Sequence, residues 1–120
     1  AALRESHEEV GVEPEAVEIL GALSPIYIPP SRFLVYPFVG HTERTPNFHA
    51  DPIEVAKIIE TPVEVLLNHS YRKEKPLFVK TEKAEIPVKY FDIAGHVVWG
   101  ATAMILSEFA EIIKRCTSPI

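Results

Sequence analysis

Residues 1–12 read AALRESHEEVGV, and this stretch decides how the rest of the chain is interpreted. Its spacing predicts a helix on which Glu5, Glu8 and Glu9 share one face, because residues three and four apart are neighbours on a helix. A different, mostly apolar face can pack inward and consists of Leu3, Ser6 and Val10. Gly11 then ends the helix, since glycine readily adopts the left-handed conformation that closes one.

The three carboxylates of this face repel one another by roughly 0.2–0.5 kcal/mol per pair in an isolated helix. A hard divalent cation converts that repulsion into a set of ligands, because magnesium takes oxygen ligands and often binds one or two carboxylates together with substrate phosphates. The alternative interpretation is a solvated acidic face that binds nothing. The residues around the carboxylates favour the first interpretation.

Residues 4–12, RESHEEVGV, resemble the second half of the Nudix box. The family writes the whole box G-x5-E-x7-R-E-U-x-E-E-x-G-U, where U is an aliphatic residue. The arginine, the three glutamates, the glycine and the last aliphatic residue all match. Ser6 departs from the pattern at a position where an aliphatic residue is usual, and a small residue there leaves the carboxylates undisturbed.

Residues 1–12 match only the last part of the box, so the resemblance implies that its first part, with a glycine and a glutamate, is absent. The strands that the family places before the box are then absent too. We expect residues 1–120 to form the C-terminal two-thirds of a single Nudix domain and to be inactive as an isolated fragment. A sheet edge left unpaired by the missing strands would favour a homodimer or a strand-exchanged assembly.

The composition limits the classes of protein to which this chain can belong. A chain of 120 residues with 47% hydrophobic residues suits one globular domain or part of one. Its net charge of −5 argues against nonspecific nucleic-acid binding, which needs a basic surface. No apolar run approaches the roughly 20 residues of a membrane helix, so no membrane partner is expected. The only cysteine, Cys116, cannot form an intramolecular disulfide, and this usage favours a reducing cytoplasm.

The later sequence predicts several strands. Apolar and β-branched runs predict strands at 17–23, 33–40, 54–60, 77–80, 84–91 and 97–99. The second of these is nearly continuous in apolar residues and should be a buried central strand, with a bulge or break at Pro37. The three prolines of residues 24–31 predict a stiff loop that forms neither a helix nor most strand pairs.

Two further helices are expected. Thr61 as N-cap and Pro62 at the first helical position predict a short helix over 62–67. The other helix begins at Gly100, and its apolar spacing predicts a stripe that buries against the sheet. The stripe consists of Ala101, Ile105, Phe109, Ile112 and Ile113, and is broadened by Met104 and Leu106.

Together with the resemblance, this order of elements implies an α+β protein: a Nudix α/β/α sandwich with a mixed central sheet whose N-terminal strands are missing. Three later stretches resemble the coenzyme A diphosphatase branch of the family. They are residues 20–23 with the proline loop and 36–39, residues 54–56 leading to Pro62, and residues 98–103. A further signature of that branch lies upstream of the box and is not in this chain.

The resemblance implies roles for the arginine and the three glutamates of the first helix. Glu8 and Glu9, with Glu5, would hold Mg²⁺ or Mn²⁺ against a diphosphate. Glu5 would also orient or deprotonate the attacking water, and Arg4 would fix a neighbouring carboxylate. Glu54 is a further acidic candidate, which either assists the metal or the water or forms a salt bridge at a sheet edge.

The proline loop offers candidates for substrate binding. Tyr27 is available to stack on a base, and Ser31 or Arg32 to reach a phosphate. Equally, Ile26 and Ile28 can pin this loop to the core without any contact to substrate.

The resemblance thus implies a metal-dependent hydrolase that cleaves a diphosphate joining a nucleoside to another group, with coenzyme A giving 3′,5′-ADP and phosphopantetheine as the leading case. The expected partner is a small-molecule nucleotide. One alternative is a Nudix hydrolase for another nucleoside diphosphate derivative, and the other is a non-catalytic Nudix-like domain that binds a nucleotide or a protein.

The basic residues 71–75 either steer a polyanion or form a solvated surface. Lone loop histidines such as His41 and His49 are more often solvent-exposed than ligands.

Overall fold

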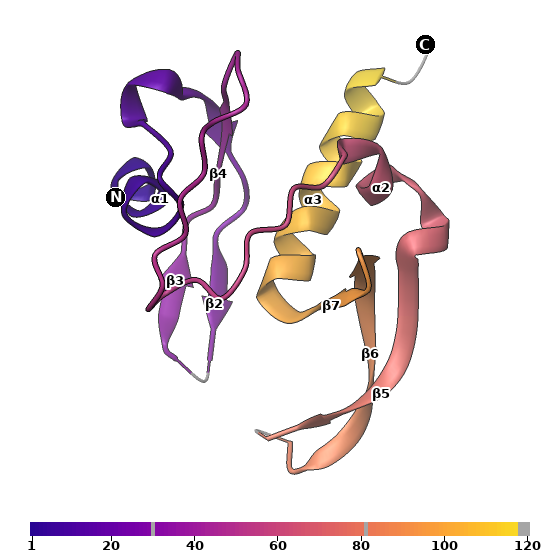
Figure 1. Ribbon diagram of the computed structural model, residues 1–120. Coiled ribbons are helices and arrows are strands. Elements are labelled where there is room, and N and C mark those ends of the chain that lie inside the picture. The colour runs from indigo at the N-terminus through magenta and orange to yellow at the C-terminus, as the bar shows by residue number, and fades with distance from the viewer. Residues whose placement is uncertain (30, 81, 118–120) are drawn as a thin grey trace. The chain divides into compact units, whose positions relative to one another are not determined.

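The computed structural model describes residues 1–29, 31–80 and 82–117. The chain divides into two compact units. Unit 1 comprises Ala1–Leu23 and Pro37–Glu60, and unit 2 comprises Ser24–Tyr36 and Thr61–Ile120. Both contain helices and strands (Figure 1), so the predicted α+β class is confirmed.

Unit 1 begins with the predicted acidic helix, α1 (Ala2–Val10). Gly11 closes it in the left-handed conformation, with φ of 78°. The Gly11 N–H donates to the His7 carbonyl at 3.0 Å, and the Val12 N–H donates to the Ser6 carbonyl at 3.4 Å. These bonds satisfy carbonyls that a helix end otherwise leaves without a donor. Only the predicted inner face is partly covered, and it consists of Leu3, Ser6 and Val10.

After α1, a short 3₁₀ helix η1 (Pro14–Ala16) leads into β1 (Glu18–Ala22). β1 pairs antiparallel with β4 (Phe38–His41), and a bulge interrupts the register between Ile19 and Gly21. The predicted strand at 17–23 is therefore confirmed over most of its length.

The predicted strand at 54–60 is wrong, since these residues form turns and irregular backbone. The reason lies just before it. The Asp51 side chain accepts a hydrogen bond from the Ile53 N–H at 2.9 Å, and the Asp51 carbonyl accepts one from the Val55 N–H at 2.8 Å. These local bonds turn the chain, as aspartate side chains often do, and they outweigh the modest β propensity of the segment.

Unit 2 corrects two expectations about the proline-rich region. β2 (Ile26–Ile28) pairs antiparallel with β3 (Phe33–Val35), so the loop predicted at 24–31 contains a strand. Its prolines flank this three-residue strand and remove no hydrogen bond from within it. For residues 33–40 the predicted break at Pro37 is confirmed, but the buried central strand is wrong. The chain breaks at Pro37, β3 and β4 pair with different strands, and Phe33 is 68% exposed.

The larger sheet of unit 2 contains β5 (Arg72–Val79), β6 (Ala84–Ile93) and β7 (His96–Val98), all antiparallel. This confirms the predicted antiparallel pair and the short strand that follows it, although β5 begins at Arg72, within the basic segment, and not at Leu77. The sheets among the described residues are three separate antiparallel sheets and not one mixed central sheet. Short connections suit antiparallel neighbours, whereas a parallel pair needs a crossover of a dozen or more residues.

Helices α2 (Val63–Leu67) and α3 (Gly100–Thr117) confirm the two later helix predictions. Pro62, not Thr61, occupies the N-cap of α2, where its missing N–H is no loss. A small core joins these helices to β6 and contains Leu66, Phe91, Ile93, Ala103 and Ala110. Within the described residues, no helix combines the length and apolarity needed to cross a bilayer.

The stripe observed on α3 overlaps the predicted one but is shifted around the helix, since Ala101, Ile105 and Ile113 are only half-buried. Ala103 and Ala110 are its buried residues, with Leu106 and Phe109 packed beside them. Met104 and Ile112 instead face solvent. The shift arises because packing against α2 and β6 selects which of the many apolar residues of α3 are buried.

The Lys73–Asp92 pair on β5 and β6 gives a prediction about pH. Lys73 Nζ donates to Asp92 Oδ2 at 2.6 Å, which lowers the pKa of Asp92 and raises the pKa of Lys73. The pair therefore stabilises the fold above about pH 4 and below about pH 10, the ordinary pKa values of the two groups. This stabilisation is lost as pH falls through the lowered Asp92 pKa or rises through the raised Lys73 pKa.

We expect Asp92→Asn to lower the urea midpoint of unfolding slightly at pH 7, because both side chains are partly exposed. At an acidic pH below the lowered pKa of Asp92 the wild-type and variant midpoints should converge, since the carboxyl group is then protonated and the charge pair is lost. Equal differences at both pH values would contradict a charge-based role for the pair.

Candidate functional site

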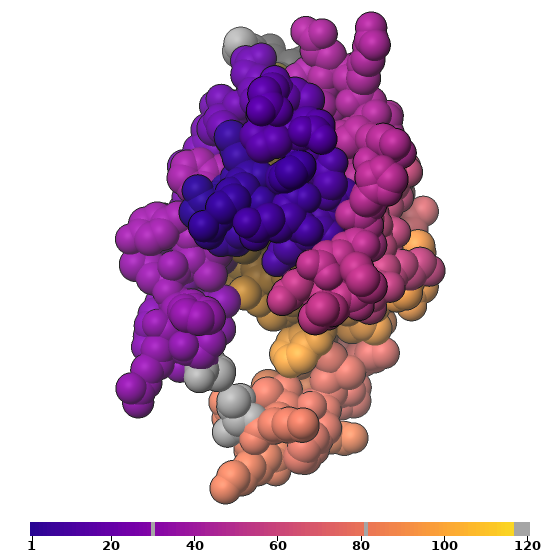
Figure 2. Space-filling view, turned by 60° about the vertical axis from the view of Figure 1, so that its left-hand side comes forward, coloured from indigo at the N-terminus to yellow at the C-terminus, as the bar shows by residue number. Residues whose placement is uncertain are grey.

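The acidic face of α1 is fully presented to solvent. Glu5, Glu8 and Glu9 are all exposed, and none of the helix residues is buried (Figure 2, indigo). The confirmed helix places them at the spacing of three and four residues that the sequence predicted. Arg4 Nε lies 3.9 Å from Glu8 Oε1, with the side chains 70% and 62% exposed. A pair this exposed contributes only about 0.3–0.5 kcal/mol, so it biases the Glu8 side chain only slightly toward Arg4.

The carboxylate oxygens of this face suit a hard divalent cation. They lie on one face of one helix, however, and cannot surround the ion. In residues 1–29, 31–80 and 82–117, no group of three or more His, Cys, Asp or Glu side chains is arranged to hold a metal ion. Magnesium commonly uses one or two carboxylates and takes its remaining ligands from water and substrate phosphates. The residues present therefore fit a cation shared with a phosphate-bearing substrate, and they do not fit a closed protein cage.

A second segment is tied to the end of α1. The His49 N–H donates to the Val10 carbonyl at 2.9 Å, and the Asp51 N–H donates to the Glu9 carbonyl at 2.8 Å. The turn that carries Glu54 starts at Asp51 and so begins beside the last turn of the acidic helix. Glu54 itself is exposed, and the salt bridge considered for it does not occur among the described residues.

The substrate-binding candidates lie in the β2–β3 hairpin of unit 2, whereas α1 belongs to unit 1. Tyr27 projects from β2 and is 57% exposed, with its ring free to contact a partner. Ser31 serves the turn, since its hydroxyl donates to the Ile28 carbonyl at 3.2 Å and accepts from the Phe33 N–H at 3.3 Å. Arg32 has φ of 57°, an uncommon value for a residue with a side chain, and belongs to the same turn.

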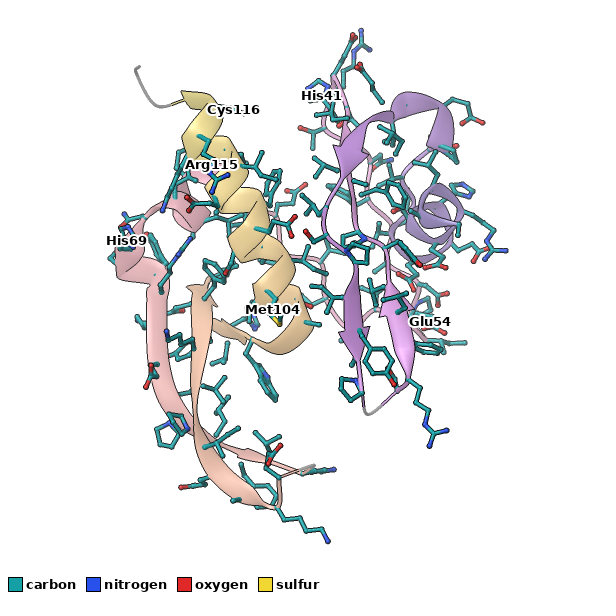
Figure 3. The ribbon with its side chains drawn as sticks, turned by 180° about the vertical axis from the view of Figure 1, so that it is seen from behind. His41, Glu54, His69, Met104, Arg115 and Cys116 are labelled. Carbon is teal, nitrogen blue, oxygen red and sulfur yellow. The ribbon has the colours of Figure 1, made fainter. Side chains whose placement is uncertain are left out.

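The two loop histidines are not brought together with the acidic helix face as ligands. His41 ends β4 and Glu54 lies at the other end of unit 1 (Figure 3). His49 lies against Gly11 through its backbone and Cβ.

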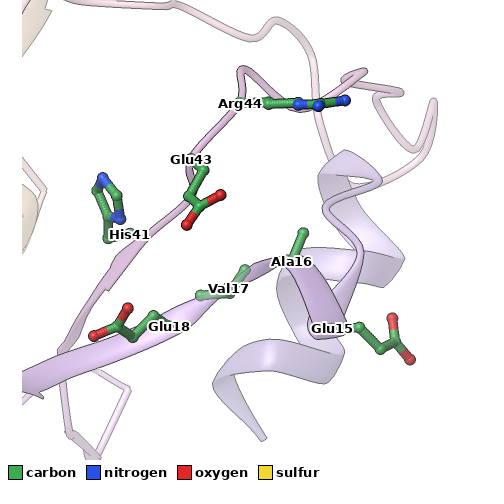
Figure 4. A pocket seen from close by; sticks show the side chains of 7 residues that line it. All are labelled: Glu15, Ala16, Val17, Glu18, His41, Glu43 and Arg44. Atoms are coloured by element: carbon green, nitrogen blue, oxygen red, sulfur yellow. The ribbon is translucent and has the colours of Figure 1, made fainter.

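One pocket of unit 1 was not foreseen from the sequence. It has a volume of about 450 Å³ and mixes acidic and basic side chains from β1, β4 and the adjoining turns (Figure 4). Its polar lining consists of Glu15, Glu18, His41, Glu43 and Arg44. Antiparallel pairing places Glu18 directly opposite His41. This pairing joins residues distant in sequence, so no local pattern signals it.

No protein-family model matches the chain. Curated proteins named "Uncharacterized Nudix hydrolase NudL" do. The protein from Photorhabdus laumondii is 35% identical over 114 residues, which are 94% of this chain and 59% of that protein. Those from Enterobacter sp. (strain 638) and Citrobacter koseri are 38% and 33% identical over 110 residues, covering 92% of this chain and 56% of each relative. The chain thus spans a little over half the length of these relatives, and the similarity supports the Nudix family.

Proposed function

We propose that this chain belongs to the Nudix hydrolase family and takes part in the divalent-metal-dependent hydrolysis of a diphosphate that joins a nucleoside to another group. The observation that carries the proposal is the exposed face of α1, on which the glutamates of the motif-like stretch lie together and are followed by a left-handed glycine. The named relatives, which match over more than nine-tenths of the chain, add independent support.

Four side chains of α1 have a role in this proposal. Glu8 and Glu9, with Glu5, hold Mg²⁺ or Mn²⁺ together with the diphosphate. Such a cation neutralises charge on phosphate oxygens and makes water a stronger acid. Glu5 orients the attacking water and accepts its proton. Arg4 keeps the Glu8 carboxylate on the acidic face through their 3.9 Å pair.

Glu54 is the second candidate for the base. The support for it is that its turn starts where the Asp51 N–H donates to the Glu9 carbonyl at the end of the acidic helix. Mutation separates the two candidates, because the true base controls the acidic limb of the pH–rate profile.

Coenzyme A is the substrate we propose first, giving 3′,5′-ADP and phosphopantetheine. The support is the resemblance of residues 20–23, 36–39, 54–56 and 98–103 to the coenzyme A diphosphatase branch. Tyr27 is exposed and suited to stacking on adenine. Arg32 remains the phosphate candidate of the hairpin, while Ser31 is the weaker one because the turn uses its hydroxyl.

A non-catalytic Nudix-like binding domain is the competing function. It is favoured by one observation: the described residues offer no complete protein ligand set for a metal. Such a domain would bind a nucleotide without turnover, and its binding would be unaffected by a chelator.

An assay of the complete gene product distinguishes these functions. With Mg²⁺ or Mn²⁺ we expect coenzyme A to yield 3′,5′-ADP and phosphopantetheine, detected by mass spectrometry, and EDTA to reduce the rate to background. A parallel panel of other nucleoside diphosphate derivatives tests the substrate. Hydrolysis of another member of the panel, without hydrolysis of coenzyme A, would identify that compound as the substrate instead. Nucleotide binding that EDTA does not affect, without any hydrolysis, would favour the non-catalytic binding domain.

A further inference from the structure

Unit 2 contains a cavity of about 850 Å³ that the proposed hydrolysis does not use. One wall is formed by β5 and β6, and the other by Trp99 and the first turns of α3, where Figure 3 labels Met104. The strand wall is rich in cations: Arg72, Lys73 and Lys89 line it, against a single acidic side chain, Glu74.

Arg72 is the residue of this cavity whose hydrogen bonding is incomplete. Its Nε and Nη2 atoms are buried without a hydrogen-bond partner. Its guanidinium carbon lies 5.3 Å from the centroid of the Phe91 ring, so one flat face is already used. Leaving buried donors of a charged group without acceptors is costly, and native structures rarely do so without a ligand, ion or water to explain it.

The two unpaired donors are chemically informative. Nε–H and Nη2–H point along the same edge of the guanidinium, which is the edge that binds two oxygens of a phosphate or carboxylate at once. Arg72 is half-buried and lines the cavity, but its Nε and Nη2 atoms are themselves buried. An anion in the cavity therefore reaches this edge only after rotation about the terminal bonds of the side chain.

The two lysines of the cavity lie beside acidic side chains, whereas Arg72 does not. Lys73 is paired with Asp92 at 2.6 Å, and Lys89 lies opposite Glu74 in the β5–β6 register. Arg72 has no acidic partner among the described residues. A phosphate monoester carries a higher charge than a carboxylate to set against the unpaired guanidinium, and it binds the same edge with two oxygens.

The opposite wall is apolar and accessible. Trp99 is 42% exposed and Met104 is 61% exposed, although both belong to residue types that usually bury. An exposed indole offers a flat stacking surface, and a methionine side chain adapts to rings of different shape. The cavity therefore combines a group that binds oxygens bidentately with a surface for a planar ring.

We propose that this cavity binds a small organic phosphate carrying a planar ring, with the phosphate on Arg72 and the ring against Trp99. This site lies wholly within unit 2, and the proposal is independent of the metal-dependent function assigned to α1.

The chain's only tryptophan, Trp99, reports on the cavity directly. In EDTA, which removes any contribution of a metal, titration with AMP is expected to change the tryptophan fluorescence saturably. Inorganic phosphate lacks the planar ring, and adenosine lacks the phosphate. Each should therefore bind at least about tenfold more weakly than AMP, because the first loses the stacking contact and the second loses the charge-assisted hydrogen bonds. No change with AMP at millimolar concentration, or equal affinity for AMP and adenosine, would overturn the proposal.

Variants test the residues. Arg72→Lys keeps the charge but loses the bidentate edge, and should weaken AMP binding by about tenfold or more. Arg115→Lys is the matched control, since Arg115 is exposed and pairs with Glu111 on the last turns of α3, and its affinity should stay within about twofold. Circular dichroism checks the fold. Should Arg72→Lys unfold, Lys89→Gln provides the same test, with weaker AMP binding and unchanged adenosine binding expected. Wild-type affinity in a folded Arg72→Lys or Lys89→Gln variant would contradict the phosphate assignment.

Discussion

Replacing Glu8 or Glu9 by glutamine in the complete gene product is expected to lower the rate of metal-dependent diphosphate hydrolysis by at least about a hundredfold. Loss of a residue that only supports a metal ligand already costs about 10- to 100-fold, and a ligand itself should cost no less. Glutamine keeps the size of the side chain but removes the negative charge, so it weakens the hold on a hard cation.

Stability should move little in these variants, which separates a functional loss from a folding defect. Both side chains are exposed and contact no core residue. Removing one charge relieves repulsion with its neighbours by about 0.2–0.5 kcal/mol per pair. In Glu8→Gln this gain is offset by loss of the exposed Arg4 pair, which is worth about as much. We therefore expect an unchanged or slightly raised urea midpoint.

Glu60→Gln is the matched control, because Glu60 is an exposed glutamate of the same unit that lies outside α1. Its activity and its affinity for Mn²⁺, measured by electron paramagnetic resonance, should equal those of the wild type. Wild-type turnover and wild-type Mn²⁺ affinity in both α1 variants would remove the acidic helix from the mechanism. Loss of Mn²⁺ binding without loss of turnover would show a metal site unrelated to catalysis.

Gly11→Ala is expected to produce the second large effect, a destabilisation of unit 1 by about 2 kcal/mol or more. Gly11 has φ of +78°, and a side chain in the left-handed region costs roughly 1–2 kcal/mol. A Cβ at this position would also lie 3.0 Å from the His49 N and 3.2 Å from the His49 Cβ. Since the His49 N–H donates to the Val10 carbonyl, relief of this contact must disturb the segment that docks on the helix end.

The glycines of this chain supply graded controls. Gly95 has φ of +82° and open space around its Cβ position, so Gly95→Ala should show only the conformational cost of about 1–2 kcal/mol. Gly21 has open space and no unusual φ, and Gly21→Ala should stay within about 0.5 kcal/mol of the wild type. Urea unfolding gives the ranking, and hydrogen exchange of the His49 amide reports the local contact. Equal losses for Gly11→Ala and Gly95→Ala would show that the contact with His49 contributes nothing.

Sequence reasoning succeeded where the cause of structure is local. The spacing within α1 and the glycine after it were sufficient, because helix periodicity and left-handed closure depend on residues within one or two turns. The β5–β6 hairpin and α3 followed in the same way from short-range pattern. The α1 carboxylates, and hence the residues of the proposed metal site, were named from sequence alone, and their role stays a prediction.

Tertiary structure alone decided which segments meet and which faces are covered. The same apolar run at 33–40 served as two strands because β3 and β4 have different partners, and α3 buried Ala103 and Ala110 because α2 and β6 select that side. Likewise, only folding joins Asp51 to the end of α1 and leaves the Arg72 donors buried without an acceptor. These features depend on contacts between residues far apart in the chain, whose energies exceed the small local preferences that a sequence pattern records.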